Sequence, residues 1–172
     1  MTHTLLDVSH WQPPIDWMTA RRAGVEGVYI KVSQGASYRD PSAAQHYQGA
    51  KAVGMLVGFY HFVTNDNGIK QFDNFAAAAN AIGKTDLPPT LDVETYTENM
   101  GTVYPSQDVV DVIGLRLMKY HSHVAIYTNV GFGNHIFTKP IFGTRYKIWV
   151  AHWGVSTPTL PNVWKGQPYM CW

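Results

Sequence analysis

Short apolar segments recur along the chain and predict β-strands. Most are continuous apolar runs without strict alternation of apolar and polar residues, which is typical of parallel strands buried on both faces. The predicted strands span residues 5–8, 28–32, 55–62, 89–95, 124–128 and 147–151, with a short one at 169–172. We therefore expect a largely parallel sheet.

Helical patterns fill the gaps between the first five predicted strands. Asp16 can cap a short helix that ends near Gly24. We place Asp40 as the N-cap of the next helix, with Pro41 at its first position and Gly54 at its end. Two longer helices have apolar stripes at Ile69, Phe72, Phe75, Ala76, Ala79 and Ile82, and at Val109, Val112, Ile113, Leu117 and Tyr120. This alternation predicts βαβ units.

The pattern changes in the second half of the chain. Residues 131–146 contain glycine, proline and aromatic residues without a clean apolar stripe, and residues 156–168 contain three prolines. We expect strands joined by loops there. A regular (β/α)₈ barrel typically needs about 250 residues, whereas this chain has 172. The sequence therefore predicts a single α/β domain over residues 1–172, with the form of an irregular TIM-like barrel.

The composition narrows the range of functions. Apolar residues make up 45% of the chain, which is enough for a core and excludes general disorder. Thirteen basic and twelve acidic residues give a formal charge of +1, so we expect neither nucleic acid nor a membrane surface as a partner. The first residues lack the pattern of a signal peptide. A single cysteine, Cys171, excludes an intramolecular disulfide and a Cys-rich zinc site.

Polar residues interrupt three apolar runs near the ends where parallel α/β barrels carry their chemistry. Asp7 lies in the first run, Tyr60 in the third, and Asp92 and Glu94 in the fourth. Asp92 and Glu94 are two residues apart on a strand, so their side chains share a face. Repulsion and partial burial should raise the pKa of one carboxyl, as a general acid requires. A solvated edge, a metal site or a salt bridge would use the same spacing.

The order of motifs along the chain resembles that of glycoside hydrolase family 25, the lysozymes that cleave the glycan of bacterial peptidoglycan. Each motif alone is weak, but their joint order and spacing over most of the chain are specific. The motifs are Asp7-Val8-Ser9-His10-Trp11-Gln12 (D-x-S-x-x-Q), Ile15-Asp16-Trp17, Ile30-Lys31-Val32-Ser33-Gln34-Gly35 (I-K-A-T-E-G), Asp40-Pro41, Gly58-Phe59-Tyr60-His61-Phe62 (G-x-Y-H-F), Leu91-Asp92-Val93-Glu94 (L-D-x-E), Ile126-Tyr127-Thr128 and Trp149-Val150-Ala151. The resemblance implies an irregular barrel of about five βα units followed by plain strands.

The resemblance also implies an activity. An N-acetylmuramidase hydrolyses β-1,4 bonds between N-acetylmuramic acid and N-acetylglucosamine in peptidoglycan, with no metal or other cofactor. Glu94 is then the general acid, Asp92 stabilises positive charge or orients the substrate, and Asp7 is a third carboxylate in the same mouth. A phage endolysin fits a chain that is made in the cytoplasm and acts on the cell wall, as does a bacterial enzyme exported without a signal peptide.

Aromatic residues near strand ends can stack on the apolar face of a sugar ring, although core packing explains such rings equally well. The predicted substrate-binding residues are Tyr60, Gln34, Tyr127, Trp11, Trp149 and Trp153. Gln34 stands where many family members carry Glu, so the cleft has one negative charge fewer. We interpret His61 as a core histidine.

The chain departs from the family pattern near residue 172. Met170-Cys171-Trp172 resembles the beginning of the family's penultimate strand, and the last strand, with its own Asp, has no counterpart. We therefore expect a domain that is C-terminally incomplete relative to the family, with an exposed sheet edge. It should be a monomer unless another segment or chain closes that edge.

Two other functions stay open from the residues. A metal-dependent polysaccharide deacetylase would use Asp and His ligands. A non-catalytic glycan-binding barrel would explain a missing strand, but it gains little from three carboxylates that face a neutral sugar backbone.

Overall fold

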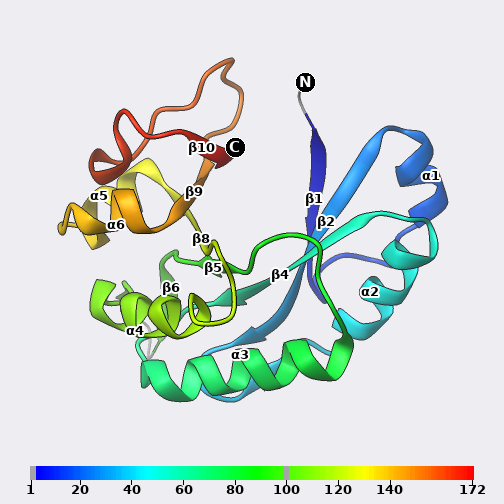
Figure 1. Cartoon of the computed structure of the whole chain (residues 1–172), viewed down its shortest axis with the longest axis horizontal. Helices are drawn as coiled ribbons and strands as arrows, with labels where there is room; N and C mark the ends of the chain where they lie inside the picture. The colour runs from blue at the N-terminus through cyan, green and yellow to red at the C-terminus, as the bar shows by residue number, and fades with distance from the viewer. Residues whose placement is uncertain (1–2, 99–100) are drawn as a thin grey trace.

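The computed structural model describes residues 3–98 and 101–172, and these form one curled, open sheet with helices around it (Figure 1). Within the described residues, seven strands run parallel in the order β1-β2-β4-β5-β8-β9-β10. They are β1 Thr4–Val8, β2 Val25–Gln34, β4 Leu56–Phe62, β5 Thr90–Asp92, β8 Ala125–Asn129, β9 Lys147–Ala151 and β10 Tyr169–Cys171. The short strand β3 (Tyr38–Arg39) is antiparallel to β2. β1 and β10 are the two edges of the sheet.

Each of the seven predicted strands has a counterpart in this sheet, so the predicted parallel α/β arrangement is confirmed. The continuous apolar runs reflect burial of the central strands. Val28, Ile30 and Val57 are fully buried in β2 and β4, as is Ile126 in β8.

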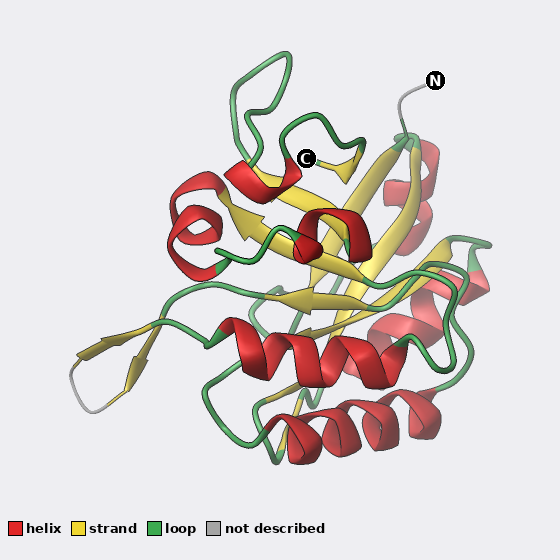
Figure 2. Cartoon of the chain, turned by 60° about the vertical axis from the view of Figure 1, so that its left-hand side comes forward, coloured by secondary structure: helices red, strands yellow, loops and turns green. Residues whose placement is uncertain are grey.

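The helices lie along the outer face of the curled sheet, and the apolar core fills the layer between them (Figure 2). They are α1 Trp17–Arg22, α2 Ala43–Ala52, α3 Gly68–Ile82, α4 Gln107–Leu117, α5 Val130–Ile136 and α6 Ile141–Arg145, with a 3₁₀ turn at Asn162–Trp164. None of the helices in the described part of the chain has the length and apolarity needed to cross a bilayer.

The first two helices test the predicted caps. Asp16 caps α1 as predicted, because its side chain accepts a hydrogen bond from the Thr19 amide (2.9 Å). The prediction that Asp40 caps α2 is wrong, since the N-cap is Ser42. Asp40 instead accepts a hydrogen bond from the Ser42 amide (2.9 Å), and its other oxygen lies 2.8 Å from Nδ1 of His10. Asp40 therefore joins the turn before α2 to the loop after β1.

Helices α3 and α4 pack side by side, and their buried faces differ from the predicted stripes. Ile69 and Tyr120 were expected to be buried but are 44% and 74% exposed. The buried residues are Gly68, Gln71, Asn74, Phe75 and Ala78 in α3, and Val110, Ile113, Gly114 and Leu117 in α4. Gln71 and Asn74 are buried because they bind backbone groups of neighbouring loops, which an apolar stripe does not reveal.

Residues 131–146 contain two short helices, so the expectation of loops alone was wrong. The Asn129 side chain caps α5 by accepting a hydrogen bond from the Phe132 amide (2.8 Å). The ring of Phe137 packs against those of Phe142 and Trp164, with centroids 4.9 and 5.2 Å apart. Helices of seven and five residues are too short to display a clear apolar stripe.

A hairpin that the sequence analysis did not predict follows β5 and projects from the body of the domain (Figure 2). Its strands are β6 (Tyr96–Glu98) and β7 (Gly101–Val103). The Tyr96 hydroxyl accepts a hydrogen bond from the Asn65 amide (2.8 Å), which joins the base of the hairpin to the loop after β4.

Candidate active site

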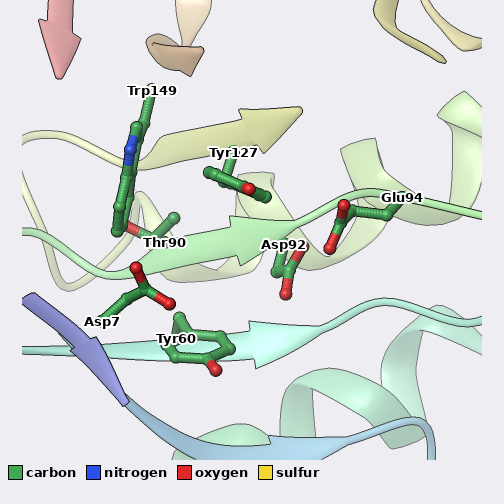
Figure 3. Close-up of a pocket in the computed structure, with 7 residues that line it drawn as sticks. All are labelled: Asp7, Tyr60, Thr90, Asp92, Glu94, Tyr127 and Trp149. Carbon is green, nitrogen blue, oxygen red and sulfur yellow. The ribbon is translucent and has the colours of Figure 1, made fainter. Parts of the chain in front are cut away.

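A pocket opens on the inner face of the curled sheet, at the C-terminal ends of its strands (Figure 3). Its empty volume, which includes open solvent at the mouth, is about 430 Å³. Its lining residues are Asp7, Tyr60, Thr90, Asp92, Glu94, Tyr127 and Trp149. Parallel α/β barrels carry their active sites at this end of the sheet.

Cross-strand pairing explains why these residues meet. Asp92 on β5 is the direct neighbour of Phe62 on β4 and of Tyr127 on β8, and Tyr127 is the neighbour of Trp149 on β9. Neighbouring strands are about 4.8 Å apart, so these four residues form a continuous row. Leu91 takes the opposite face and is fully buried in the core beneath the helices.

Tyr29 on β2 packs against Trp149, one of the residues that line the pocket. Its ring lies 5.0 Å from the ring of Trp149, and its hydroxyl donates to the Pro88 carbonyl (3.2 Å). Gly58 on the adjacent strand makes room for it, because a Cβ atom at this position would come within 2.3 Å of the Tyr29 ring.

Asp92 is the most deeply buried carboxylate of the pocket, with only 8% of the residue exposed. Its Oδ1 atom is buried and has no hydrogen-bond partner among the described residues. Burial raises the pKa of Asp92 well above the ordinary value, and the charge of Glu94 raises it further. The carboxyl group of Asp92 is therefore costly to ionise, and its Oδ1 atom is available to bind a ligand.

The prediction that Glu94 lies on the same strand as Asp92 is wrong, because β5 ends at Asp92. The Glu94 carboxyl nevertheless turns toward that of Asp92 (Figure 3). Burial is the main cause that raises the pKa of Glu94, and its interaction with Asp92 acts in the opposite direction. The two carboxyls are therefore coupled, and their protonation is a property of the pair.

Asp7 lies on the edge strand β1, where solvent reaches it, and its carboxyl points into the pocket (Figure 3). Surrounding protein atoms nevertheless raise the pKa of Asp7 through desolvation. Burial also raises the pKa values of Tyr60 and Tyr127, with contributions from Asp92 and Asp7. Both phenols therefore stay protonated at neutral pH and can donate hydrogen bonds.

The structure brings six of the nine predicted site residues into this pocket and leaves three outside its lining. Gln34 instead accepts a hydrogen bond from Nζ of Lys31 (2.7 Å). Trp11 is 79% exposed beside His10, and Trp153 is 80% exposed in the loop after β9. Both tryptophans follow the C-terminal ends of their strands.

Two residues of this region were missed by the sequence analysis. Thr90 lines the pocket, and its position two residues before Asp92 on one strand could have identified it. Lys31 is only 6% exposed on β2. A lysine inside an otherwise apolar run was the available signal. By contrast, the interpretation of His61 as a core residue is confirmed, because it is fully buried on the helix side of β4.

The pocket combines three carboxyls of raised pKa with two phenols and an indole ring. Such a group can hold a proton for transfer to a leaving oxygen, stabilise positive charge and stack against a sugar. In the part of the chain that the structure describes, no three His, Cys, Asp or Glu side chains converge so as to hold a metal ion.

The chain is similar in sequence and in fold to known proteins. The family model of glycosyl hydrolases family 25 matches residues 6–172. Lysozyme M1 of Streptomyces globisporus is 32% identical over 168 residues, which cover 91% of this chain and 57% of that protein. The autolytic lysozyme of Clostridium acetobutylicum is 26% identical over 171 residues, which cover 95% of this chain and 49% of that protein. The chain thus spans about half the length of these relatives. The crystal structure of the bacterial lysozyme from Streptomyces coelicolor superimposes with a TM-score of 0.80 at 28% identity, covering 99% of this chain and 82% of that one.

Proposed function

The chain belongs to glycosyl hydrolases family 25, and we propose that it is a muramidase that hydrolyses the β-1,4 bond between N-acetylmuramic acid and N-acetylglucosamine in peptidoglycan. The observation that carries this proposal is the coupled pair Asp92 and Glu94, which lies at the strand ends of an aromatic pocket with both pKa values raised.

We assign the role of general acid to Glu94. A carboxyl of raised pKa retains its proton nearer to neutral pH and can deliver it to the glycosidic oxygen. Glu94 is only half-buried, whereas Asp92 lies deeper in the sheet. Glu94 is therefore the member of the pair that a bound leaving group can reach.

The substrate's own 2-acetamido group supplies the nucleophile in this proposal. Its carbonyl oxygen forms a bond to the anomeric carbon while the glycosidic bond breaks and the leaving oxygen takes the proton of Glu94. Water then attacks the anomeric carbon of the cyclic intermediate, gives its proton to Glu94 and restores the acetamido group. Asp92 and Asp7 stabilise the positive charge of the intermediate, and the reaction retains the anomeric configuration.

Aromatic side chains bind the sugar rings in this proposal. Tyr127 and Trp149 present adjoining rings, with centroids 5.1 Å apart, on one wall of the pocket. Tyr60 on the opposite wall offers a phenol hydroxyl (Figure 3). Trp11 and Trp153 extend the rim to neighbouring sugars of the glycan, and Gln34 acts on the site through Lys31.

We also propose that the curled sheet is an irregular TIM-like barrel with five βα units. In support, β1, β2, β4, β5 and β8 are each followed by an α-helix before the next parallel strand, whereas β9 leads to β10 through a long segment that contains the short 3₁₀ turn Asn162–Trp164. Action on the cell wall after synthesis in the cytoplasm, and a monomeric state, are further proposals that follow from the sequence.

The proposed function is tested with purified bacterial cell walls. A muramidase lowers the turbidity of the suspension and releases fragments with new muramic acid reducing ends. A deacetylase would release acetate without new reducing ends. A glycan-binding domain would sediment with the walls and release neither product.

A further inference from the structure

Lys31 is a buried cation that the proposed reaction does not yet use. Only 6% of the residue is exposed, although burial of an ammonium group is costly unless the charge is compensated. Among the described residues Lys31 forms no ion pair. One of its three N–H donors has an acceptor, the Gln34 side-chain oxygen at 2.7 Å.

The sheet register places this ammonium beside Asp92. Gln34, Phe62 and Asp92 are successive neighbours on β2, β4 and β5. Nζ of Lys31 binds the first of them and lies 4.8 Å from the ring centroid of the second. The ammonium therefore lies at the level of Asp92, one strand away from it.

The other titratable groups near Lys31 and the carboxyl pair do not supply a second cation among the described residues. Asp7 faces the pair from β1, Tyr60 from β4 and Tyr127 from β8, and none of these groups is cationic. Asp40 interacts with Lys31, but it also binds Nδ1 of His10 at 2.8 Å. His61 is fully buried on the other face of β4.

We infer that Lys31 is the counter-ion of the Asp92–Glu94 pair and opposes the binding of a second proton by the pair. Without a cation, two desolvated carboxyls would hold their protons to a higher pH, and the site would keep less of the negative charge that stabilises the intermediate. Because Gln34 fixes the ammonium through a neutral amide, it leaves the full positive charge for the pair. Lys31 is thus a positioning residue for the proton of the pair. The effect of Lys31 on catalysis rests on the proposed function, whereas its effect on the pKa values of the pair does not.

Two substitutions change this charge in different ways. Lys31→Met removes the ammonium. Gln34→Glu keeps it but places a carboxylate at hydrogen-bond distance, so that the charge is cancelled. We expect each substitution to raise both apparent pKa values of the pair by about one unit. Lys31→Arg keeps the positive charge, so the apparent pKa values of the pair should stay near those of the wild type.

Matched controls change surface charge away from the pocket. Lys139 is half-exposed and pairs with Asp108, so Lys139→Met removes one surface cation. Gln48 is exposed on α2, so Gln48→Glu adds one surface carboxylate. Neither control should shift the apparent pKa values of the Asp92–Glu94 pair.

The measurement is a ¹³C NMR titration of the Asp92 and Glu94 carboxyl carbons, with assignment from Asp92→Asn and Glu94→Gln. Apparent pKa values that stay at their wild-type positions in folded Gln34→Glu protein would overturn the inference, even where Lys31→Met does not fold. The pH profile of kcat/KM on cell walls gives a second readout. Its acid limb should move up by about one unit, so that kcat/KM well below the limb falls about tenfold.

The two proposals fail in different ways. A wild-type protein that does not cleave peptidoglycan, but whose carboxyl titration shifts in Gln34→Glu, would refute the proposed function and keep Lys31 as the counter-ion. A wild-type protein that cleaves peptidoglycan with a pH profile unaffected by Gln34→Glu and Lys31→Met would keep the function and refute the role of Lys31.

Discussion

The Ser33 hydroxyl lies 2.8 Å from Nδ1 of His61, in the layer between the sheet and α3. Nε2 of the same ring lies 3.1 Å from the side-chain oxygen of Gln71, whose amide nitrogen donates to the Thr64 and Asp66 carbonyls. Nε2 of His61 therefore donates to Gln71, and Nδ1 accepts the hydrogen of Ser33. This arrangement fixes His61 as a neutral tautomer.

Burial of this neutral ring makes the stability of the fold depend on pH. Desolvation lowers the pKa of His61 to about 4, whereas an unfolded chain has a value near 6.5. The unfolded state binds more protons between these values, so stability should fall as the pH drops from 6.5 to about 4. The largest loss is about 3 kcal/mol.

His61→Gln should remove this dependence, because glutamine does not titrate. Urea unfolding at several pH values measures it, and the difference between the two proteins isolates His61 from the carboxyls. His123→Gln, at an exposed position, is the control. Parallel stability curves for the wild type and His61→Gln would contradict the assignment.

Asp92→Asn should stabilise the fold and abolish activity. The raised pKa of Asp92 means that its ionised form is less favourable in the folded state than in the unfolded one. That cost is present above the ordinary carboxyl pKa and disappears as the pH falls below it. We expect a higher urea midpoint at pH 7, no gain at pH 3, and a loss of activity of about 10²-fold or more. Asp73→Asn makes the same charge change at an exposed site; an equal gain there would argue against burial as the cause.

Glu94→Gln should abolish wall lysis and leave the fold intact. Glutamine has nearly the same shape but cannot donate an acidic proton, and loss of general acid catalysis costs roughly 10²- to 10⁴-fold in rate. Turbidity assays measure the rate, and circular dichroism checks the fold. Near-normal activity of this variant would refute the assignment of Glu94 as the general acid.

Excess EDTA should leave the activity unchanged, because proton transfer by Glu94 and attack by the substrate's acetamido group require no Lewis acid. The measurement is wall lysis before and after chelation, followed by addition of zinc. Inhibition by EDTA that zinc reverses would favour a metal-dependent hydrolase.

The first product released should have the β configuration, as in the β-linked substrate. Attack by the acetamido group inverts the anomeric carbon once and water inverts it again, so the net result is retention. ¹H NMR of the first-formed anomer on a defined peptidoglycan oligomer measures this outcome. Early appearance of the α-anomer would show inversion and refute the substrate-assisted route.

The sequence was sufficient to place the strands and most of the pocket because both follow from local rules. Apolar runs mark buried strands, and alternation along β5 puts Thr90 and Asp92 on one side, with Glu94 following just beyond the end of the strand. Their meeting with Asp7 required only the rule that parallel strands end at one edge of the sheet.

The features that the sequence did not reveal depend on contacts between distant segments. Gln71 is polar yet fully buried because it completes hydrogen bonds of the loop after β4. Asp40 resembles an N-cap locally, but His10, thirty residues earlier, binds it. In the sequence, Lys31 is only a polar residue within an apolar strand, and the sheet register is needed to place it near Phe62 and Asp92. Composition and periodicity do not encode such pairings.

The open sheet gives the pocket a mechanical property. Asp7 lies on the edge strand β1, and Trp149 lies on β9, so the covalent and hydrogen-bonded path between them runs through β2, β4, β5 and β8. Among the described residues no ladder bridges β1 and β10 directly. Across the inner face of the sheet, side-chain packing joins the two sides instead, since the Tyr29 ring on β2 lies 5.0 Å from the Trp149 ring on β9. The distance between Asp7 and Trp149 therefore depends on packing of side chains, whereas the central row of Phe62, Asp92 and Tyr127 is held by direct pairing of neighbouring strands.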